Sequence, residues 1–169
     1  MNKYIKFAIA PLLILPHLSF AQSHTQAIPL SAQKVHSTTI KEIVHSLTKR
    51  HYNKITINNE TSSNLLDSYI ATLDPSRSYF YQADIKEFDA LRHKLDDEIK
   101  KNSVTSGFLI YNRLQQRILE RVDYAITRLE TPEKFDFTLN ENFETDRKDS
   151  PWILSTLDMD NLWRKRLKS

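Results

Sequence analysis

The sequence is almost free of glycine, with a single one, Gly107, among 169 residues. All-β folds need glycine in their tight turns, and doubly wound α/β folds need it in the loops that hold phosphates. P-loop and dinucleotide-binding motifs require several glycines and are therefore excluded. Apolar residues instead recur at helical spacing, so the sequence predicts helices joined by polar connections.

Cysteine is absent altogether. Its absence excludes disulfides, a thiol nucleophile and cysteine-based metal sites. It also excludes a lipoprotein, because no cysteine is present to carry the lipid. A chain with this composition must depend on its apolar core alone for stability.

Catalytic and metal-binding patterns are missing as well. A nucleophilic serine needs a base and an oxyanion hole, yet no G-x-S-x-G motif occurs, and Ser103 and Ser106 beside Gly107 are typical of a helix start. No two histidines of the mature chain are four residues apart, and H-E-x-x-H is absent. The acidic run Asp96–Glu98 indicates a solvated helix face. The sequence therefore predicts no catalytic residue, metal or cofactor, and a chain that is not an enzyme on its own.

The first residues have the anatomy of an export signal. Lys3 and Lys6 precede an apolar run over residues 7–18, and Ser19-Phe20-Ala21 forms a small-x-small cleavage site. We expect a signal peptide over 1–21, a periplasmic location and no stable membrane span after cleavage. The formal net charge of +3 includes the two lysines of the signal, so removing them leaves +1. No basic field remains to indicate nucleic-acid binding.

The mature chain is expected to be one helical domain over 35–169, preceded by a flexible leader over 22–34. Apolar spacing predicts helices over about 35–52, 60–73 and 83–101. A fourth helix, capped by Ser103 or Thr105 and ended by Pro132, has an apolar stripe. That stripe consists of Phe108, Tyr111, Leu114, Ile118, Val122, Ala125 and Leu129.

Helix ends can be read from the sequence in two places. Asn58 or Asn59 can cap the second helix, and Asp74-Pro75 stops it, because the residue before proline avoids the helical region. After Glu133 the helical pattern disappears, and the alternation of Phe135, Phe137 and Leu139 indicates a short extended stretch. A last helix begins near Thr156 or Asp158. The fold class is an all-α irregular bundle of about five helices, with a mostly extended segment before the last.

Several segments, in a fixed order over about residues 40–168, carry a family resemblance. They are Tyr69–Pro75 with Ser78-Tyr79-Phe80, Ala83–Phe88, Arg121 with Tyr124 and Ala125, Phe135-Asp136-Phe137, Asp146–Trp152, and Leu162–Arg166. This ordered set resembles the amino-terminal domain of the tail-specific proteases, which are periplasmic carboxy-terminal processing serine proteases.

The resemblance implies a particular place in a longer protein. Family members continue into a protease core with an inserted PDZ domain, and their serine nucleophile and lysine base lie in that core. Their substrates are proteins recognised through their C-terminal ends, and the helical domain helps to enclose the active site and can dock an adaptor lipoprotein. No position here matches a catalytic residue of the family, so we expect a chain truncated before the PDZ domain and the protease core.

Eight residues are candidates for packing and docking. Tyr79, Phe80, Phe135 and Phe137 are expected to cover the seams of the bundle, and Trp152 and Trp163 to anchor the last segment. Asp146 and Arg147 belong to the most specific of the resembling segments. The leading hypothesis is a non-catalytic scaffold and docking domain. The alternative is a stand-alone periplasmic protein-binding or inhibitor module. The basic run Arg164–Lys168 is read as the cationic end of an amphipathic helix or as a contact for phosphate or anionic lipid.

Overall fold

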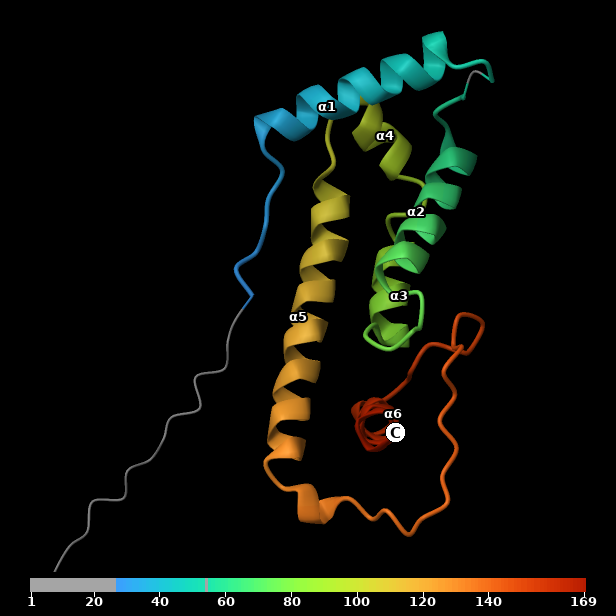
Figure 1. Cartoon of the computed structure of the whole chain (residues 1–169). Coiled ribbons are helices and arrows are strands. Elements are labelled where there is room, and N and C mark those ends of the chain that lie inside the picture. Colours follow the sequence, from blue (N-terminus) through green and yellow to red (C-terminus); the bar gives the residue numbers. More distant parts are fainter. Residues whose placement is uncertain (1–26, 54) are drawn as a thin grey trace, which may run out of the picture.

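The computed structural model describes residues 27–53 and 55–169 (Figure 1). The signal peptide expected over 1–21 and the first part of the expected leader lie outside these residues. The α-helices are α1 (Lys34–His45), α2 (Asn59–Leu73), α3 (Gln82–Asp89), α4 (Leu95–Lys100), α5 (Thr105–Leu129) and α6 (Thr156–Lys168). The described residues contain no strand, only an isolated bridge between Tyr81 and Ile153, so the all-α fold class is confirmed.

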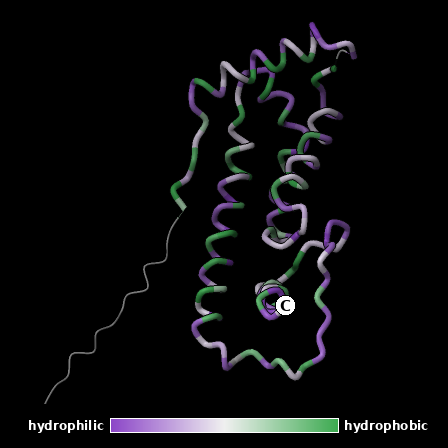
Figure 2. The backbone as a smooth tube through the Cα atoms, viewed as in Figure 1, coloured by the Kyte–Doolittle hydropathy of each residue, from purple (hydrophilic) through white to green (hydrophobic). Residues whose placement is uncertain are grey.

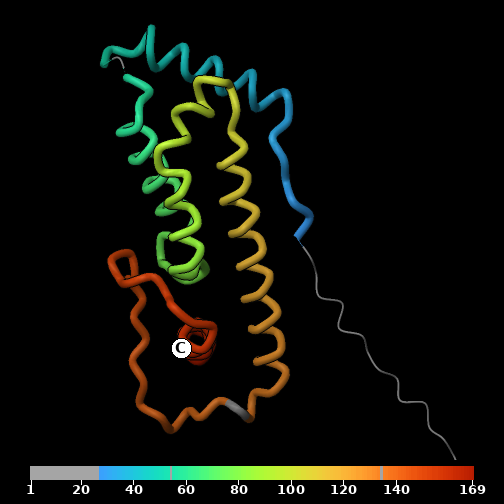
Figure 3. The backbone as a smooth tube through the Cα atoms, turned by 180° about the vertical axis from the view of Figure 1, so that it is seen from behind, coloured from blue at the N-terminus to red at the C-terminus, as the bar shows by residue number. Residues whose placement is uncertain are grey.

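The helices form an open frame rather than a regular bundle. Figures 1 and 3 show α5 standing beside α2, α3 and α4, with α1 lying across one end of them. After α5 the chain passes around the other end and climbs back towards the loop between α2 and α3, and α6 then lies between that loop and α5. The part of the chain after α5 thereby returns to the elements that precede it.

The α2 helix begins and ends as the sequence predicts. The Asn58 side chain accepts a hydrogen bond from the Thr61 amide at 3.0 Å, which confirms the expected cap. Leu66 and Ile70 are buried, and the helix ends at Leu73 before Asp74-Pro75. One face of α2 therefore belongs to the core.

The helix expected over 83–101 is wrong as a single element. It is broken into α3 and α4 by turns over residues 90–94. The buried Ser62 of α2 accounts for the break: its hydroxyl donates to the Arg92 carbonyl at 2.6 Å and accepts from the Leu95 amide at 3.1 Å. A side chain from another helix thus satisfies backbone groups that a continuous helix would have paired internally.

The α5 helix starts where expected, but its cap comes from elsewhere. The residue at the cap position is Val104, and Thr105 is the first helical residue. The Ser103 hydroxyl accepts only a long hydrogen bond from the Thr105 amide, at 3.4 Å. Instead the Glu98 carboxylate of α4 accepts from the Ser106 amide at 3.0 Å and from the Ser106 hydroxyl at 2.6 Å. An acidic group at this end also suits the helix dipole.

The core lies between α2, α3, the start of α4 and the first half of α5. Its buried members are Leu66, Ile70, Phe80, Phe88, Leu95, Ile110 and Leu114. Figure 2 shows apolar and polar positions alternating along α5. The predicted stripe is wrong in its second half, where Val122 is 46% and Leu129 is 56% exposed. The buried residue there is Arg121, which faces an acid of α6.

Two further segments differ from expectation. The first helix is regular only to His45 and continues as a wider π-helical turn, Ser46–Arg50, and none of its residues is buried. The alternating stretch after α5 is not a strand, because a 3-10 turn, Pro132–Lys134, is followed by further turns over 137–139. Phe135 is consequently buried, while Phe137 is 69% exposed.

One finding concerns membranes. Of the helices in the described residues, none combines the length and the apolar character that crossing a bilayer requires.

Candidate functional site

The loop between α2 and α3, residues 74–81, is organised by the carboxylate of Asp74. This side chain is 1% exposed and accepts backbone hydrogen bonds from Ser78, Tyr79 and Phe80, each at 2.9 Å. Arg77 adopts a positive φ of 46°, which lets the chain turn back sharply enough to direct these three amides at one carboxylate. The conformation of loop 74–81 is thus held by the buried carboxylate of its own first residue. Tyr79 and Phe80 contact different neighbours.

Four of the eight candidate residues meet at this loop. Phe80 packs edge-on against Phe88, with ring centroids 5.3 Å apart, and against Trp152 at 6.4 Å. Tyr79 packs edge-on against Trp163 at 5.5 Å. We call Tyr79, Phe80, Trp152 and Trp163 the aromatic seam. Edge-to-face pairs of this kind add to the stabilisation that burial of the rings provides.

Polar contacts fix the seam in one arrangement. The indole Nε1 of Trp163 donates to the Ser78 carbonyl at 2.8 Å, and Arg77 lies over the Trp152 ring, 5.0 Å from its centroid. Arg77 also donates to the carbonyl of Ser150. The two tryptophans therefore hold the last segment of the chain against loop 74–81.

A second, smaller core continues from the seam. Tyr81, Ile153 and Met159 are buried together, with Leu162 and Trp163 packed against them. The Gln82 amide donates to the Ile153 carbonyl at 2.8 Å, beside the isolated bridge. The start of α3 and the approach to α6 are thus joined through both side chains and backbone.

Asp84 joins α3 to α5 beneath the seam. Its carboxylate is 1% exposed, accepts from the Tyr81 amide at 3.0 Å and from Arg117 Nε at 2.9 Å, and is bonded to Arg113 as well. Burial alone would raise the pKa of Asp84, but hydrogen bonds from Arg117, the Tyr81 amide and Arg113 outweigh it and lower the pKa below its ordinary value. The carboxylate is therefore held ionised inside the protein.

The second half of α5 is joined to α6 by another buried charge. Arg121 pairs with Asp160, and the Tyr124 hydroxyl donates to the Asp160 carbonyl at 2.9 Å. Burial raises the pKa of Tyr124 above its ordinary value, and the negative charge of Asp160 adds to this, so the hydroxyl stays a donor. Together with the seam, this contact holds α6 from two sides.

The basic end of α6 is occupied by the chain itself. Arg164 and Lys168 both pair with Glu141, and hydrogen bonds from first Arg164 and then Lys168 lower the pKa of Glu141 to about 2. Arg166 lies over the Trp163 ring, 5.1 Å from its centroid. The basic run thus contributes to binding the preceding loop to α6.

The other four candidate residues make no ring contact with the aromatic seam. They are Phe135, Phe137, Asp146 and Arg147. Phe135 packs under Arg128, whose guanidinium is 5.2 Å from the ring centroid, and stands 6.0 Å from the ring of Phe137. The side chain of Asp146 is 74% exposed, and Arg147 pairs with Glu144 at 3.3 Å. The structure therefore brings together the residues of loop 74–81 and the two tryptophans, and places the remaining candidates along the connection from α5 to α6.

Sequence reasoning missed the polar residues that organise the site. The sequence pattern identifies Asp74 only as a helix stop, and it indicates no contact across elements for Asp84, Arg117 or Arg121. One signal was available: Arg113, Arg117 and Arg121 recur every fourth residue and must share one face of a helix. Charges at this spacing on a core-facing helix indicate acidic partners on its neighbours.

The site consists of packed rings, ion pairs and satisfied polar groups. Within residues 27–53 and 55–169, no group of three or more histidines or acids is placed to hold a metal ion. The seam combines large rings with satisfied polar groups, which is typical of surfaces where protein segments associate. These features define an all-helical domain whose last helix, α6, packs against loop 74–81 through Trp163.

Comparison with known proteins identifies the domain. The family model described as the tail specific protease N-terminal domain matches residues 43–169, and the chain belongs to this family. The tail-specific protease of Haemophilus influenzae is 29% identical over 144 residues, which cover 85% of this chain and 20% of that protein. The chain thus spans about a fifth of the length of this curated relative. The family resemblance drawn from the sequence motifs is confirmed.

Proposed function

We propose that the chain serves as a non-catalytic scaffold and docking domain for the protease core and PDZ domain of a periplasmic tail-specific serine protease, which acts on proteins from their C-terminal ends. Export by the signal peptide over 1–21 places it in that compartment. A periplasmic adaptor lipoprotein is a further partner of the same domain. The family relationship supports this role, since the match is to the amino-terminal domain of such proteases.

One observation carries the docking role. The segment between Trp152 and Trp163 is attached to loop 74–81 through both tryptophans, yet it leaves Leu154 77% and Leu157 79% exposed. Two leucines exposed to this extent beside a fixed aromatic seam provide an apolar contact for another protein segment. Since α6 is bound to α5 by the ion pair of Arg121 with Asp160, a partner that contacts Leu154 and Leu157 would be attached to α5 as well as to α6.

The test uses the Haemophilus influenzae relative with its matching amino-terminal fifth removed. The mature chain is added in trans, and cleavage of a fluorescent reporter protein with an apolar C-terminal tail is followed. We expect the chain alone to cleave nothing and to restore cleavage by the shortened relative. The double variant Leu154→Asp, Leu157→Asp should restore none, whereas Leu139→Asp, at a leucine 53% exposed elsewhere, should behave as the unaltered chain.

Other outcomes contradict the proposal. Cleavage by the chain alone, retained through purification and absent from a mock preparation, would show a catalytic centre of its own. Equal restoration by the double variant would exclude the two leucines as the contact. Inhibition of the intact relative by the added chain would support the stand-alone inhibitor module instead.

A further inference from the structure

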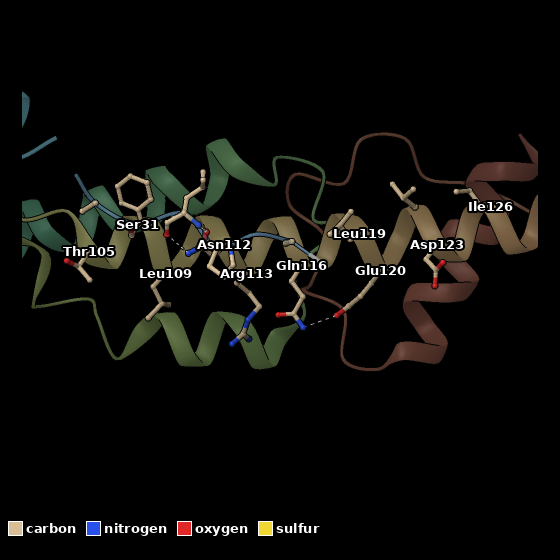
Figure 4. A pocket seen from close by; sticks show the side chains of 16 residues that line it. Ser31, Thr105, Leu109, Asn112, Arg113, Gln116, Leu119, Glu120, Asp123 and Ile126 are labelled. Carbon is tan, nitrogen blue, oxygen red and sulfur yellow. Dashed lines mark hydrogen bonds between the residues drawn. The ribbon is translucent and has the colours of Figure 1, made fainter. Parts of the chain in front are cut away.

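A groove runs along the face of α5 that the core does not use. Its volume is about 1170 Å³, and Figure 4 shows its wall as a row of α5 side chains, each one turn from the next. The row includes Leu109, Asn112, Gln116, Leu119, Asp123 and Ile126. Between Thr105 and Ile126 the helix rises by about 32 Å, which an extended peptide spans with about ten residues.

The chain's own residues 27–32, here called the leader segment, occupy one end of this groove. The Asn112 side-chain amide pairs with Leu30 in both directions: Oδ1 accepts from the Leu30 amide and Nδ2 donates to the Leu30 carbonyl, each at 2.8 Å. These two bonds join the leader to a helix 82 residues away in the chain. Within the expected flexible leader, this stretch is therefore docked on α5.

The Asn112 contact reads backbone rather than side chain. A single amide that satisfies both the N–H and the C=O of one residue recognises any extended peptide, except one with proline at that position, which has no N–H. The same logic underlies the binding of extended peptides to exposed sheet edges, where main-chain bonds give affinity and flanking pockets give preference.

The remainder of the groove is open and is lined by both apolar and polar side chains. Val122 is 46% and Ile126 is 53% exposed, further along α5 than the leader contact. Two of the charged groups in the wall are already used, since Arg113 pairs with Asp84 and Glu120 with Arg117. Leu119, Val122 and Ile126 form the apolar part of this wall. An uncharged segment with apolar side chains can pack against them, and the leader segment, Ala-Ile-Pro-Leu-Ser-Ala, is of this kind.

We propose that the α5 groove is a binding site for an extended, apolar polypeptide segment, recognised through its backbone by Asn112, and that the leader segment fills it in cis as a competitor. The leader lies outside the family match, which begins at residue 43, whereas the groove wall lies inside it. The site requires neither a protease core nor an adaptor, and so it can be tested separately from the docking role.

The test is a titration of the mature chain with a fluorescein-labelled peptide of sequence Ala-Ile-Pro-Leu-Ser-Ala, followed by fluorescence anisotropy. Leu30→Pro removes the N–H that Asn112 accepts and frees the groove, so this variant should bind the peptide about tenfold more tightly than the unaltered chain. Ile28→Pro, at an exposed position outside the groove wall, is the matched control and should not change the affinity. Circular dichroism confirms that each variant retains its helices.

Two comparisons decide whether Asn112 reads the backbone. With the Leu30→Pro chain, a peptide N-methylated at its leucine should bind about fivefold to tenfold more weakly, and Asn112→Ala should weaken the plain peptide by a similar factor. Equal affinity for the two peptides, or no binding by the Leu30→Pro chain, overturns the proposal. So does dimerisation of the chain that Asn112→Ala abolishes while the peptide fails to bind, which assigns the groove to a second copy.

Discussion

Asp74 and Asp84 are as deeply buried as the phenylalanines of the core, each 1% exposed. An ionised carboxylate is tolerated away from water only when its oxygens are bonded. Asp74 accepts three backbone amides of loop 74–81, and Asp84 accepts one amide and two arginines. Each acid therefore fixes the surrounding chain in a single arrangement and makes the position of the seam depend on one residue.

Asp84→Asn should destabilise the domain by about 2 kcal/mol, because Arg113 and Arg117 lose the buried carboxylate that they share and keep only the more exposed acids Glu87 and Glu120. The estimate is below that for a fully buried pair, since both arginines are partly exposed. Urea denaturation of the mature chain gives the free energy of unfolding. Asp89→Asn removes an acid that is 59% exposed and paired with Arg92, and should cost less than about 0.5 kcal/mol. Equal losses in the two variants would contradict the role given to Asp84.

The same carboxylate should make stability depend on pH in one direction. Its pKa is lowered by folding, so its contribution is fully present above the ordinary value of 3.8 and is lost as the pH falls through the lower pKa of the folded state. The stability difference between the unaltered chain and Asp84→Asn should thus be the same at about pH 7 and pH 5 and smaller at about pH 3. Urea midpoints at these three values measure it, and a difference that grows on acidification would exclude the assignment.

Whole elements were predictable where local chemistry decides them. The ends of α2, with Asn58 before it and Asp74-Pro75 after it, follow from residues next to one another in the chain. The inner face of the second half of α5 does not, because its buried Arg121 is explained only by Asp160, which lies 39 residues further on. The break between α3 and α4 likewise depends on Ser62, which sequence periodicity cannot connect to the residues it bonds.

The contacts of the candidate residues were likewise predictable only where residues close together in the sequence decide them. Tyr79 and Phe80 follow a helix stop, so their position in a loop could be read from the sequence. Their contacts with Trp163 and Trp152 join parts of the chain more than 70 residues apart, such as the 85 residues between Ser78 and Trp163. Periodicity specifies which face of an element is apolar, but not which distant element covers it.

Ser62→Ala should cost about 2 kcal/mol of stability, because the Leu95 amide and the Arg92 carbonyl lose a buried partner. Hydrogen exchange followed by NMR should show the Leu95 amide exchanging faster, while amides in the middle of α5 keep their protection relative to global unfolding. Ser68→Ala, at an exposed position on the same helix, provides the control and should be near neutral. Unchanged exchange at Leu95 would mean that another group holds the break.

At the scale of the molecule, two cores are joined by the contacts of Trp163 with the Tyr79 ring and the Ser78 carbonyl, which we call the latch. The main core uses α2, α3, α4 and α5, and the smaller one joins Tyr81 to Ile153 and Met159. Trp163 belongs to the second core by packing and reaches the first through Tyr79 and the Ser78 carbonyl. A short helix such as α6 is marginal by itself, so its stability depends on this latch.

Trp163→Ala should therefore release α6 while the main core stays folded. The substitution removes the indole bond to the Ser78 carbonyl and the ring contact with Tyr79. The remaining contacts of α6 are those of Asp160 with α5, of its basic end with Glu141, and of Met159 in the smaller core. Trypsin should then cleave after Arg164, Lys165 or Arg166 at least about tenfold faster, because cleavage of a native segment requires local opening. Leu157→Ala, at a side chain 79% exposed on the same helix, should leave cleavage unchanged. If instead sites in α5 became sensitive at the same rate as those in α6, the two cores would unfold as one unit and the latch would be part of a single cooperative domain.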